Sequence, residues 1–330
     1  MKRESFDEER REIVMTGKRK YFIDMDIGDD IDDAIALYSA MKRRFDIVGI
    51  TTVFRNTSDR ARQTKKLLLK YGNGYEAVPV YAGYGVPMGE TAREYPHIPH
   101  YMPDLEEERY RPDGTAPEAA VDFLLDCCRR YGKDLTVIAI GPFTNIARAI
   151  EKDADALNAA GSVCIMGGAY FKQYADWNVM CDVAAADIMF RNLQNLSCIG
   201  ADVTHTMLAE QALYDDLLSY TGSEPGHRYL TQLCGLWRKD RPKANLLLHD
   251  PLVIYYADDP AICTMRPASV VVMTDGYARG MTLNVDAYGK KRLNPAPYAD
   301  FDDTRKILVA ADADRETFNE RILRDMCETE

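Results

Sequence analysis

A dense group of aspartates is the strongest chemical signal in the sequence. Residues 24–33 read Asp-Met-Asp-Ile-Gly-Asp-Asp-Ile-Asp-Asp, which places six carboxylates within ten residues. Carboxylates this close repel one another, so a compact turn that carries them needs a compensating cation or bound polar groups. Oxygen ligands suit a hard divalent ion such as Ca²⁺ or Mg²⁺. A helix cap by Asp33 explains one or two of these residues but not Asp24 and Asp26, so we interpret the group as a metal site.

The segments on either side of this acidic turn predict how it is held. Residues 21–23 form a short apolar run typical of a buried strand, and residues 34–41 are rich in helix formers. The turn therefore joins a strand to a helix. In an open α/β sheet, that is where ligands bind.

Polar residues also follow other predicted strands and open one predicted helix. Because the carboxyl ends of parallel strands meet at one edge of a sheet, we expect these side chains to line a single crevice with the acidic turn. A charged pair buried at a helix start also needs a partner. The residues are Asn56, Asp176 and Asn178 after strands, and His249 and Asp250 at the helix start.

The alternation of strands and helices predicts an α/β fold. We expect an open, mostly parallel Rossmann-like sheet flanked by helices, in which the continuous apolar run at 135–140 is buried on both faces. Two β-rich runs near 270–273 and 281–285 predict a small additional β-hairpin. Residues 210–248 predict a helical region near the site.

Length and composition limit the classes of function. The chain has 330 residues and a net charge of −11, which argues against a nucleic-acid binder. No apolar stretch approaches the length of a membrane span and the N-terminus is too charged for a signal peptide, so we expect a cytoplasmic protein. The eight cysteines form no Cys-x-x-Cys pair, which favours reduced core residues. We expect residues 1–20 to be a charged extension and residues 21–330 to form a single domain.

Residues 84–115 interrupt the alternation with five prolines and with His97 and His100. A loop this long in a compact domain is usually functional, so we interpret it as a flap over the site. The two histidines could bind a metal if the loop folds back, although an exposed loop is the favoured interpretation.

Several motifs together resemble the inosine-uridine preferring nucleoside hydrolases, from Phe22 to about Met326. Each motif is weak alone, and their common order and spacing make the resemblance specific. The motifs are the Asp-x-Asp-x-Gly…Asp-Asp-Ala turn, Ile50-Thr51-Thr52-Val53…Asn56, Gly141-Pro142-Phe143-Thr144-Asn145-Ile146-Ala147, Met166-Gly167-Gly168 and His249-Asp250-Pro251.

The resemblance implies a Ca²⁺-dependent hydrolase that cleaves a nucleoside to ribose and free base. It also implies that the ion binds the ribose 2′ and 3′ hydroxyls and the attacking water, with Asp26 as the general base and His249 near the leaving base. The implied metal ligands are Asp26, Asp33, Asp250 and the backbone carbonyl of Ile140. The implied sugar-binding residues are Asp32, Asn56, Asp176 and Asn178. A homodimer or homotetramer and a role in nucleoside salvage follow by resemblance alone.

General chemistry supports these roles. Cleavage of an N-glycosidic bond builds positive charge on the ribosyl ring, which nearby carboxylates stabilise. Ca²⁺ lowers the pKa of its water less than Zn²⁺ does, so a carboxylate base is useful. A titratable His can assist departure of the base. Trp237, twelve residues before His249, could stack on the base, and a core position on a helix face is an equal alternative.

Two segments depart from the family pattern. The acidic turn is two residues longer, so that with Asp32-Asp33-Ala34 aligned to the family's Asp-Asp-Ala, Asp29-Asp30 or a neighbouring pair is extra. The family's Glu-Phe-Asn is here Asp176-Trp177-Asn178, after a shorter segment that lacks a counterpart for one sugar-binding Asn. A modified or different nucleoside therefore stays open as the substrate.

Two other functions are alternatives to nucleoside hydrolysis. A phosphatase of the haloacid dehalogenase type also ends its first strand in an Asp-x-Asp, but Asp32-Asp33 comes too early for that class and His249-Asp250-Pro251 has no role in it. A non-catalytic Ca²⁺-dependent ribose or nucleoside binder is the second alternative. The presence of both Asp26 and His249 argues against it.

Overall fold

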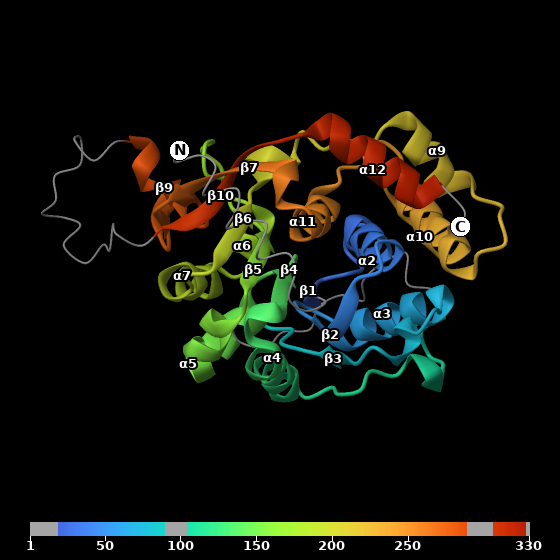
Figure 1. The fold of residues 1–330 in the computed structure, drawn as a ribbon, viewed down its shortest axis with the longest axis horizontal. Helices are drawn as coiled ribbons and strands as arrows, with labels where there is room; N and C mark the ends of the chain where they lie inside the picture. Colours follow the sequence, from blue (N-terminus) through green and yellow to red (C-terminus); the bar gives the residue numbers. More distant parts are fainter. Residues whose placement is uncertain (1–18, 90–103, 289–305, 328–330) are drawn as a thin grey trace, which may run out of the picture.

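An eight-stranded sheet forms the centre of the chain (Figure 1). The computed structural model describes residues 19–89, 104–288 and 306–327. The predictions for the N-terminal extension, apart from its last two residues, and for His97 and His100 lie outside these residues. The strands follow the order β3-β2-β1-β4-β5-β6-β10-β7. Their bounds are β1 Lys20–Met25, β2 Asp46–Thr52, β3 Val80–Ala82, β4 Leu135–Ala139, β5 Ser162–Met166, β6 Leu196–Ile199, β7 Cys263–Ala268 and β10 Ile307–Ala313.

The sheet is parallel except at one edge. Strands β1 to β6 and β10 pair in parallel, and β7 pairs with β10 in the antiparallel direction. The central strand β4 is buried along its whole length, as its continuous apolar sequence predicts. The predicted Rossmann-like sheet is therefore confirmed.

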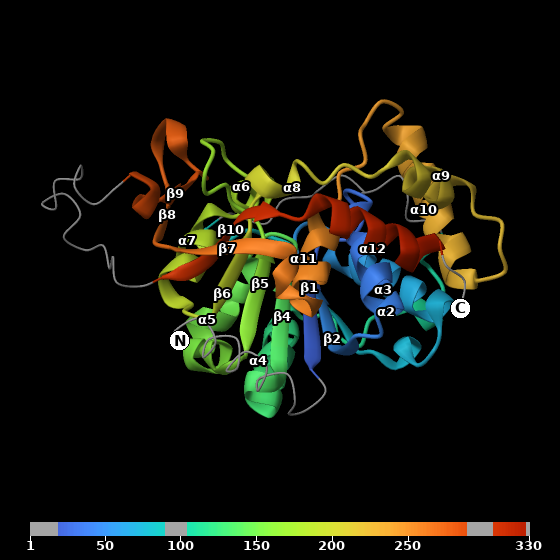
Figure 2. The ribbon, with the colours of Figure 1, turned by 45° about the horizontal axis from the view of Figure 1, so that its top comes forward.

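Helices cover both faces of the sheet (Figures 1 and 2). One hydrophobic cluster joins the sheet to α2, α3, α10, α11 and α12, and a second joins it to α4, α5 and α7 on the other face. The described helices on the first face are α2 Asp32–Lys42, α3 Thr57–Tyr71, α9 Gln211–Ser219, α10 Pro225–Asp240, α11 His249–Asp258 and α12 Arg315–Cys327. Those on the second are α4 Pro117–Tyr131, α5 Thr144–Ala159 and α7 Val183–Asn192, and the short α6 Trp177–Cys181 and α8 Ala201–Thr204 follow β5 and β6.

The smaller predicted features are present as well. Strands β8 Val270–Val272 and β9 Thr282–Asn284 form the separate antiparallel hairpin. The segment predicted to be helical contains α9 and α10. Strand β7 was not predicted, because its sequence includes Arg266 and Pro267 and only its two ends are buried. An edge strand tolerates both features.

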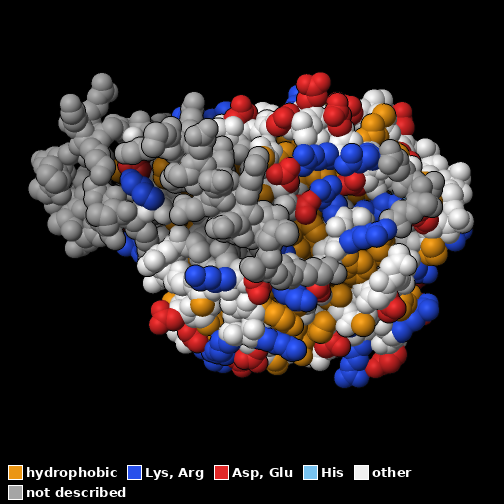
Figure 3. Space-filling model, viewed as in Figure 1, with side chains coloured by type: hydrophobic (Ala, Val, Ile, Leu, Met, Phe, Trp, Pro, Cys, Tyr) orange, Lys and Arg blue, Asp and Glu red, His pale blue; other side chains and the backbone are white. Residues whose placement is uncertain are grey.

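The described part of the surface carries mixed charges. Figure 3 shows acidic and basic side chains interspersed over one face of the molecule. Among the described helices, none has the length and apolar character needed to cross a membrane.

Candidate metal and substrate site

Two predicted metal ligands and a glycine of the Met166-Gly167-Gly168 motif follow directly on three adjacent strands of the sheet. Asp26 comes after β1, Ile140 after β4 and Gly167 after β5. The Ile140 amide donates to the Asp24 carbonyl over 2.9 Å, which continues the ladder between β1 and β4. A Cβ atom added to Gly141 would lie 2.9 Å from Asp26 Oδ1, so the Asp26 carboxylate packs against the backbone of the β4–α5 turn.

The side chain of Asp24 is held by hydrogen bonds from two neighbouring residues. Its Oδ1 accepts hydrogen bonds from Thr51 Oγ1 at 2.7 Å and from Asn145 Nδ2 at 2.8 Å. Asn145 belongs to the Gly141–Ala147 motif, at the start of α5. The motif therefore connects β1, β2 and α5 next to the turn that carries Asp26.

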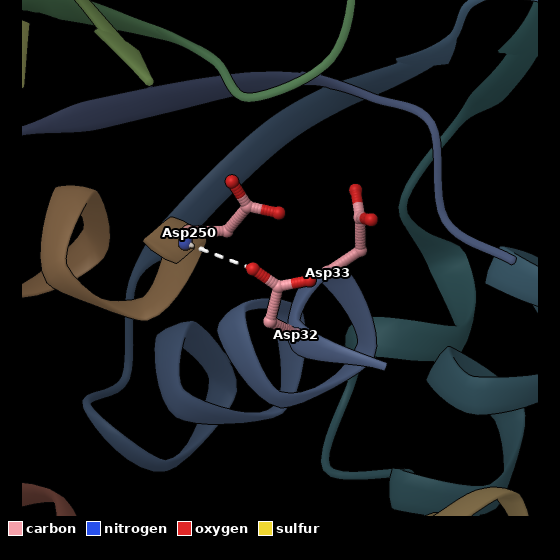
Figure 4. A group of neighbouring side chains, drawn as sticks. All are labelled: Asp32, Asp33 and Asp250. Atoms are coloured by element: carbon pink, nitrogen blue, oxygen red, sulfur yellow. Dashed lines mark hydrogen bonds between the residues drawn. The ribbon is translucent and has the colours of Figure 1, made fainter. Parts of the chain in front are cut away.

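Three carboxylates converge at the starts of two helices. Ligand atoms of Asp32, Asp33 and Asp250 all lie within 4.8 Å of one another, and all three side chains are buried. Figure 4 shows them at the first turns of α2 and α11, and the Asp250 amide donates to Asp32 Oδ2 over 3.3 Å. Within the described residues, this is the one group of three or more acidic, His or Cys side chains arranged to hold a metal ion. The positive ends of both helices favour negative charge here.

The electrostatics of this group fit a divalent cation. Burial, followed by repulsion from neighbouring carboxylates, raises the pKa of Asp32, Asp33 and Asp250 well above the ordinary range. Asp33 Oδ1 is buried and has no hydrogen-bond partner in the described part of the chain. An uncompensated group of this kind is costly, and a hard cation with oxygen ligands removes the cost. The donor set therefore fits a hard divalent cation such as Ca²⁺.

Two predicted ligands lie beside this group. Asp26 is buried, which raises its pKa to about 7 despite the nearby Arg60, and its charge acts on all three of the grouped carboxylates. The Ile140 carbonyl accepts a hydrogen bond from Asn178 Nδ2 at 3.0 Å. A carbonyl oxygen has two lone pairs, so this bond leaves one for another partner. The metal roles of Asp26 and Ile140 stay predictions, and Asp32, predicted to bind sugar, lies within the metal-binding group.

The segment after β5 brings Asp176 and Asn178 to the same edge of the sheet. Asp176 caps α6 by accepting from the Val179 amide at 3.2 Å, and a Cβ atom on Gly167 would lie 3.3 Å from Asp176 Oδ1. Asn178 Nδ2 also donates to the Met166 carbonyl at 3.1 Å. Both polar side chains are buried and are held against strand ends.

Asn56 lies at the N-cap position of α3 and is half-buried. It makes no side-chain capping bond within the described helix start, so its amide group is not used by the cap. The two preceding residues, Phe54 and Arg55, have φ angles of 67° and 61°. Side-chain-bearing residues rarely adopt this left-handed conformation, and it persists only where surrounding contacts enforce it.

His249 belongs to a chain of hydrogen-bonding side chains that the sequence analysis did not identify. Its Nδ1 lies 2.6 Å from Thr204 Oγ1, and its ring meets the ring of His205 edge to face at a centroid distance of 5.3 Å. His205 Nδ1 in turn lies 3.1 Å from the hydroxyl of Tyr174. Burial, with His205, lowers the pKa of His249 to about 4, so this imidazole is neutral at neutral pH.

Trp237 lies in the hydrophobic core on the α2 side of the sheet and is 2% exposed. Its indole Nε1 is buried and lacks a hydrogen-bond partner among the described residues. The burial favours the core alternative. A stacking contact with the base stays a prediction.

Arginines anchor the extra acidic residues of the turn. Asp29 Oδ2 lies 2.8 Å from Arg60 Nη2 and 3.6 Å from Arg55 Nη1. Asp30 Oδ2 lies 3.0 Å from Arg241 Nη1, just after α10. The sequence predicts no role for Asp30, because nothing in the local pattern identifies a partner 211 residues away.

Known proteins match this chain over most of its length. The family model described as inosine-uridine preferring nucleoside hydrolase matches residues 21–320. The chain is 28% identical to uridine nucleosidase 1 of Arabidopsis thaliana over 283 residues, which cover 82% of this chain and 83% of the relative. It is 29% identical to the inosine-uridine preferring nucleoside hydrolase of Leishmania major over 279 residues, covering 80% and 87%.

The fold also matches solved structures. A plant nucleoside hydrolase, the PpNRh1 enzyme, superposes with a TM-score of 0.77 over 95% of this chain and 100% of its own, at 24% identity. At this identity the likeness shows the fold alone. The phosphatase alternative from the sequence analysis has no support in these matches.

Proposed function

This chain belongs to the inosine-uridine preferring nucleoside hydrolase family, and we propose that it hydrolyses ribonucleosides to ribose and free base with a bound Ca²⁺ ion. The observation that supports the ion is the buried group of Asp32, Asp33 and Asp250 at the end of a parallel sheet. Asp26 and the carbonyl of Ile140 complete the proposed ligand set. When bound, the ion supplies charge that balances the carboxylates, orients the ribose hydroxyls and activates water.

The sugar is assigned to the polar residues around this group. Asn56 precedes α3, Asp176 and Asn178 come from the segment after β5, and Asp32 opens α2. As the N-glycosidic bond breaks, positive charge grows on the ribosyl ring. Carboxylates fixed by helix starts and strand ends stabilise that charge without reorganising.

Asp26 is assigned to proton transfer, and His249 to a hydrogen bond with the leaving base. An Oδ atom of Asp26 accepts a proton from the attacking water as general base. His249 lies beside the leaving base, where Thr204 fixes its ring through Nδ1. With the Thr204 hydroxyl donating to Nδ1, the single proton of the neutral imidazole is on Nε2. That N–H is then proposed to donate a hydrogen bond to the leaving base as negative charge builds on the base.

The first test is ribose release from inosine, uridine, adenosine and cytidine, with and without a Ca²⁺ chelator. We expect chelator-sensitive release, and the rates rank the bases. This panel is needed because the relatives' names emphasise uridine in one case and both inosine and uridine in another. The hydrolase assignment is abandoned if Ca²⁺-loaded protein releases no ribose from any of them.

The second test is Asp26→Asn, which keeps the size of the side chain and removes the base. We expect the fold and nucleoside binding to persist while kcat falls by a factor of about 10² or more, the range found for general-base catalysis. Calorimetric binding of a nucleoside and ribose release measure the two properties separately. Hydrolysis at the parent rate would remove Asp26 from the role of base.

Three further properties belong to the same proposal. We assign the enzyme to the cytoplasm, to nucleoside salvage and to a homodimer or homotetramer, all by analogy with the family. Sedimentation of the full chain measures the oligomeric state directly.

A further inference from the structure

A buried arginine joins the two turns that carry Asp26 and Asn56. Arg60 lies in the first turn of α3 and is 1% exposed. Its Nη1 donates to the carbonyls of Asp26 and Ile27, the latter over 2.9 Å. Its Nε donates to the Phe54 carbonyl over 2.8 Å. One guanidinium therefore contacts the end of β1 and the end of β2 together.

The second of these turns depends on such contacts. Phe54 and Arg55 are both left-handed, and their amides donate to the carbonyls of Tyr84 at 2.9 Å and Gly85 at 2.7 Å. Arg60 holds the same turn from the other side through the Phe54 carbonyl. Asn56 follows at once, so its position depends on this conformation.

The charge of Arg60 is balanced by carboxylates of the acidic turn. Its Nη2 forms an ion pair with Asp29 Oδ2 at 2.8 Å, which gives the buried cation a counterion in the extra part of the acidic turn. The carboxylates of Asp26 and Asp33 also act on Arg60 and favour its charged form. A planar guanidinium can serve four acceptors in fixed directions, whereas a lysine ammonium has three donors at one point.

We propose that Arg60 is a positioning residue for this site. It fixes the Asp26 turn relative to the Asn56 turn, so that the ion and the ribose are held in one arrangement. Asp29, part of the extension of the turn, holds Arg60 in place. The inference rests on the proposed function, because it assigns Asp26 to Ca²⁺ and Asn56 to ribose.

Variants of Arg60 and Asp29 test the inference against a matched control. The variants are Arg60→Met, Arg60→Lys and Asp29→Asn. The control is Arg43→Met. Arg43 is another largely buried arginine, and it lies just after the last residue of α2, far from the acidic turn. Its guanidinium donates hydrogen bonds to Asp258 and Asp325. For each protein we would measure the Ca²⁺ Kd by competition with a fluorescent chelator, KM and kcat for the best nucleoside, and Tm in EDTA.

Arg60→Met is expected to raise the Ca²⁺ Kd and the KM at least tenfold. Arg60→Met and Arg43→Met are expected to lower Tm by similar amounts. Arg43→Met is expected to leave the Ca²⁺ Kd and the KM within twofold of the parent values. Arg60→Lys and Asp29→Asn are expected to raise both constants by smaller factors. If Arg60→Met does not fold, Arg60→Lys decides in the same way.

Two results separate the possible failures. Constants for the Arg60 variants that match those of Arg43→Met overturn the positioning role, because the residue would then act only on stability. Failure of the proposed function is visible in the parent protein, which would bind no Ca²⁺ or release no ribose. The Arg60 variants are therefore compared with a parent protein that both binds Ca²⁺ and releases ribose.

Discussion

At the scale of single residues, this site separates carboxylates that hold structure from carboxylates available for chemistry. Asp24 is used by Thr51 and Asn145, and Asp29 by Arg60, so both have partners within the protein. Asp24 Oδ2 and Asp33 Oδ1 are both buried with no partner in the described residues, but only Asp33 belongs to the group of three carboxylates that could hold a metal ion. An acidic position in the sequence therefore does not assign a role, whereas the partners of both oxygens and the neighbouring carboxylates together do.

Thr204 offers a test of how His249 acts. Thr204 is fully buried, and Thr204→Val removes only the hydroxyl that orients the imidazole. We expect kcat for natural nucleosides to fall about tenfold, which is less than the roughly 10²- to 10⁴-fold effect of a general acid or base, because the variant removes the orienting hydroxyl and keeps the imidazole. The leaving group of a p-nitrophenyl riboside departs as p-nitrophenolate without protonation. The kcat of the variant for that substrate is therefore expected to stay within twofold of the parent value. Equal losses on both substrates would mean that Thr204 supports the fold rather than the hydrogen bond from His249 to the leaving base.

At the scale of elements, the sequence predicts what each strand presents but not which distant side chain meets it. The apolar runs predicted the parallel sheet, and the residues after them predicted the edge where Asp26, Asn56 and Asp176 gather. Arg60 escaped prediction because it lies four residues after Asn56 on a helix, and only the fold shows that its side chain reaches back toward strand ends. Thr204 and His205 were missed for the same reason, since their partner His249 is on another helix.

The end of helix α10 shows how a distant element can be tied to the acidic turn. Arg241 donates to Asp30 Oδ2 at 3.0 Å and to the Asp29 carbonyl at 2.9 Å. Both side chains are partly exposed, so we expect Arg241→Gln to change the free energy of unfolding by no more than about 1 kcal/mol. The same variant is expected to speed amide hydrogen exchange at the end of α10, because local opening then breaks fewer contacts.

The control for Arg241→Gln is Arg191→Gln, which removes another exposed arginine ion pair, with Asp187 on α7. Its stability change is expected to be similar, with exchange in α10 unaltered. Unchanged exchange in Arg241→Gln would show that core packing alone, including Leu230 and Leu233, holds α10 in place.

At the scale of the whole molecule, the site joins parts of the chain that are far apart in sequence. Helices α2 and α11 lie side by side, and their first turns bring Asp32 and Asp33 next to Asp250, 218 residues away for Asp32. Such a group has no fixed geometry in the unfolded chain. A cation that binds these three carboxylates therefore binds the folded state and stabilises it.

Thermal unfolding tests that linkage. We expect Ca²⁺ at a hundred times its Kd to add about 2.7 kcal/mol to the free energy of unfolding and to raise Tm by several degrees over the value in EDTA. Asp33→Asn removes one charge from the group, so the Ca²⁺-dependent rise in Tm is expected to disappear. Asp187→Asn, at a partly exposed position on α7, is expected to keep the full rise. An equal rise in both variants would place the stabilising Ca²⁺ elsewhere on the protein, and the carboxylates at the starts of α2 and α11 would then need another cation.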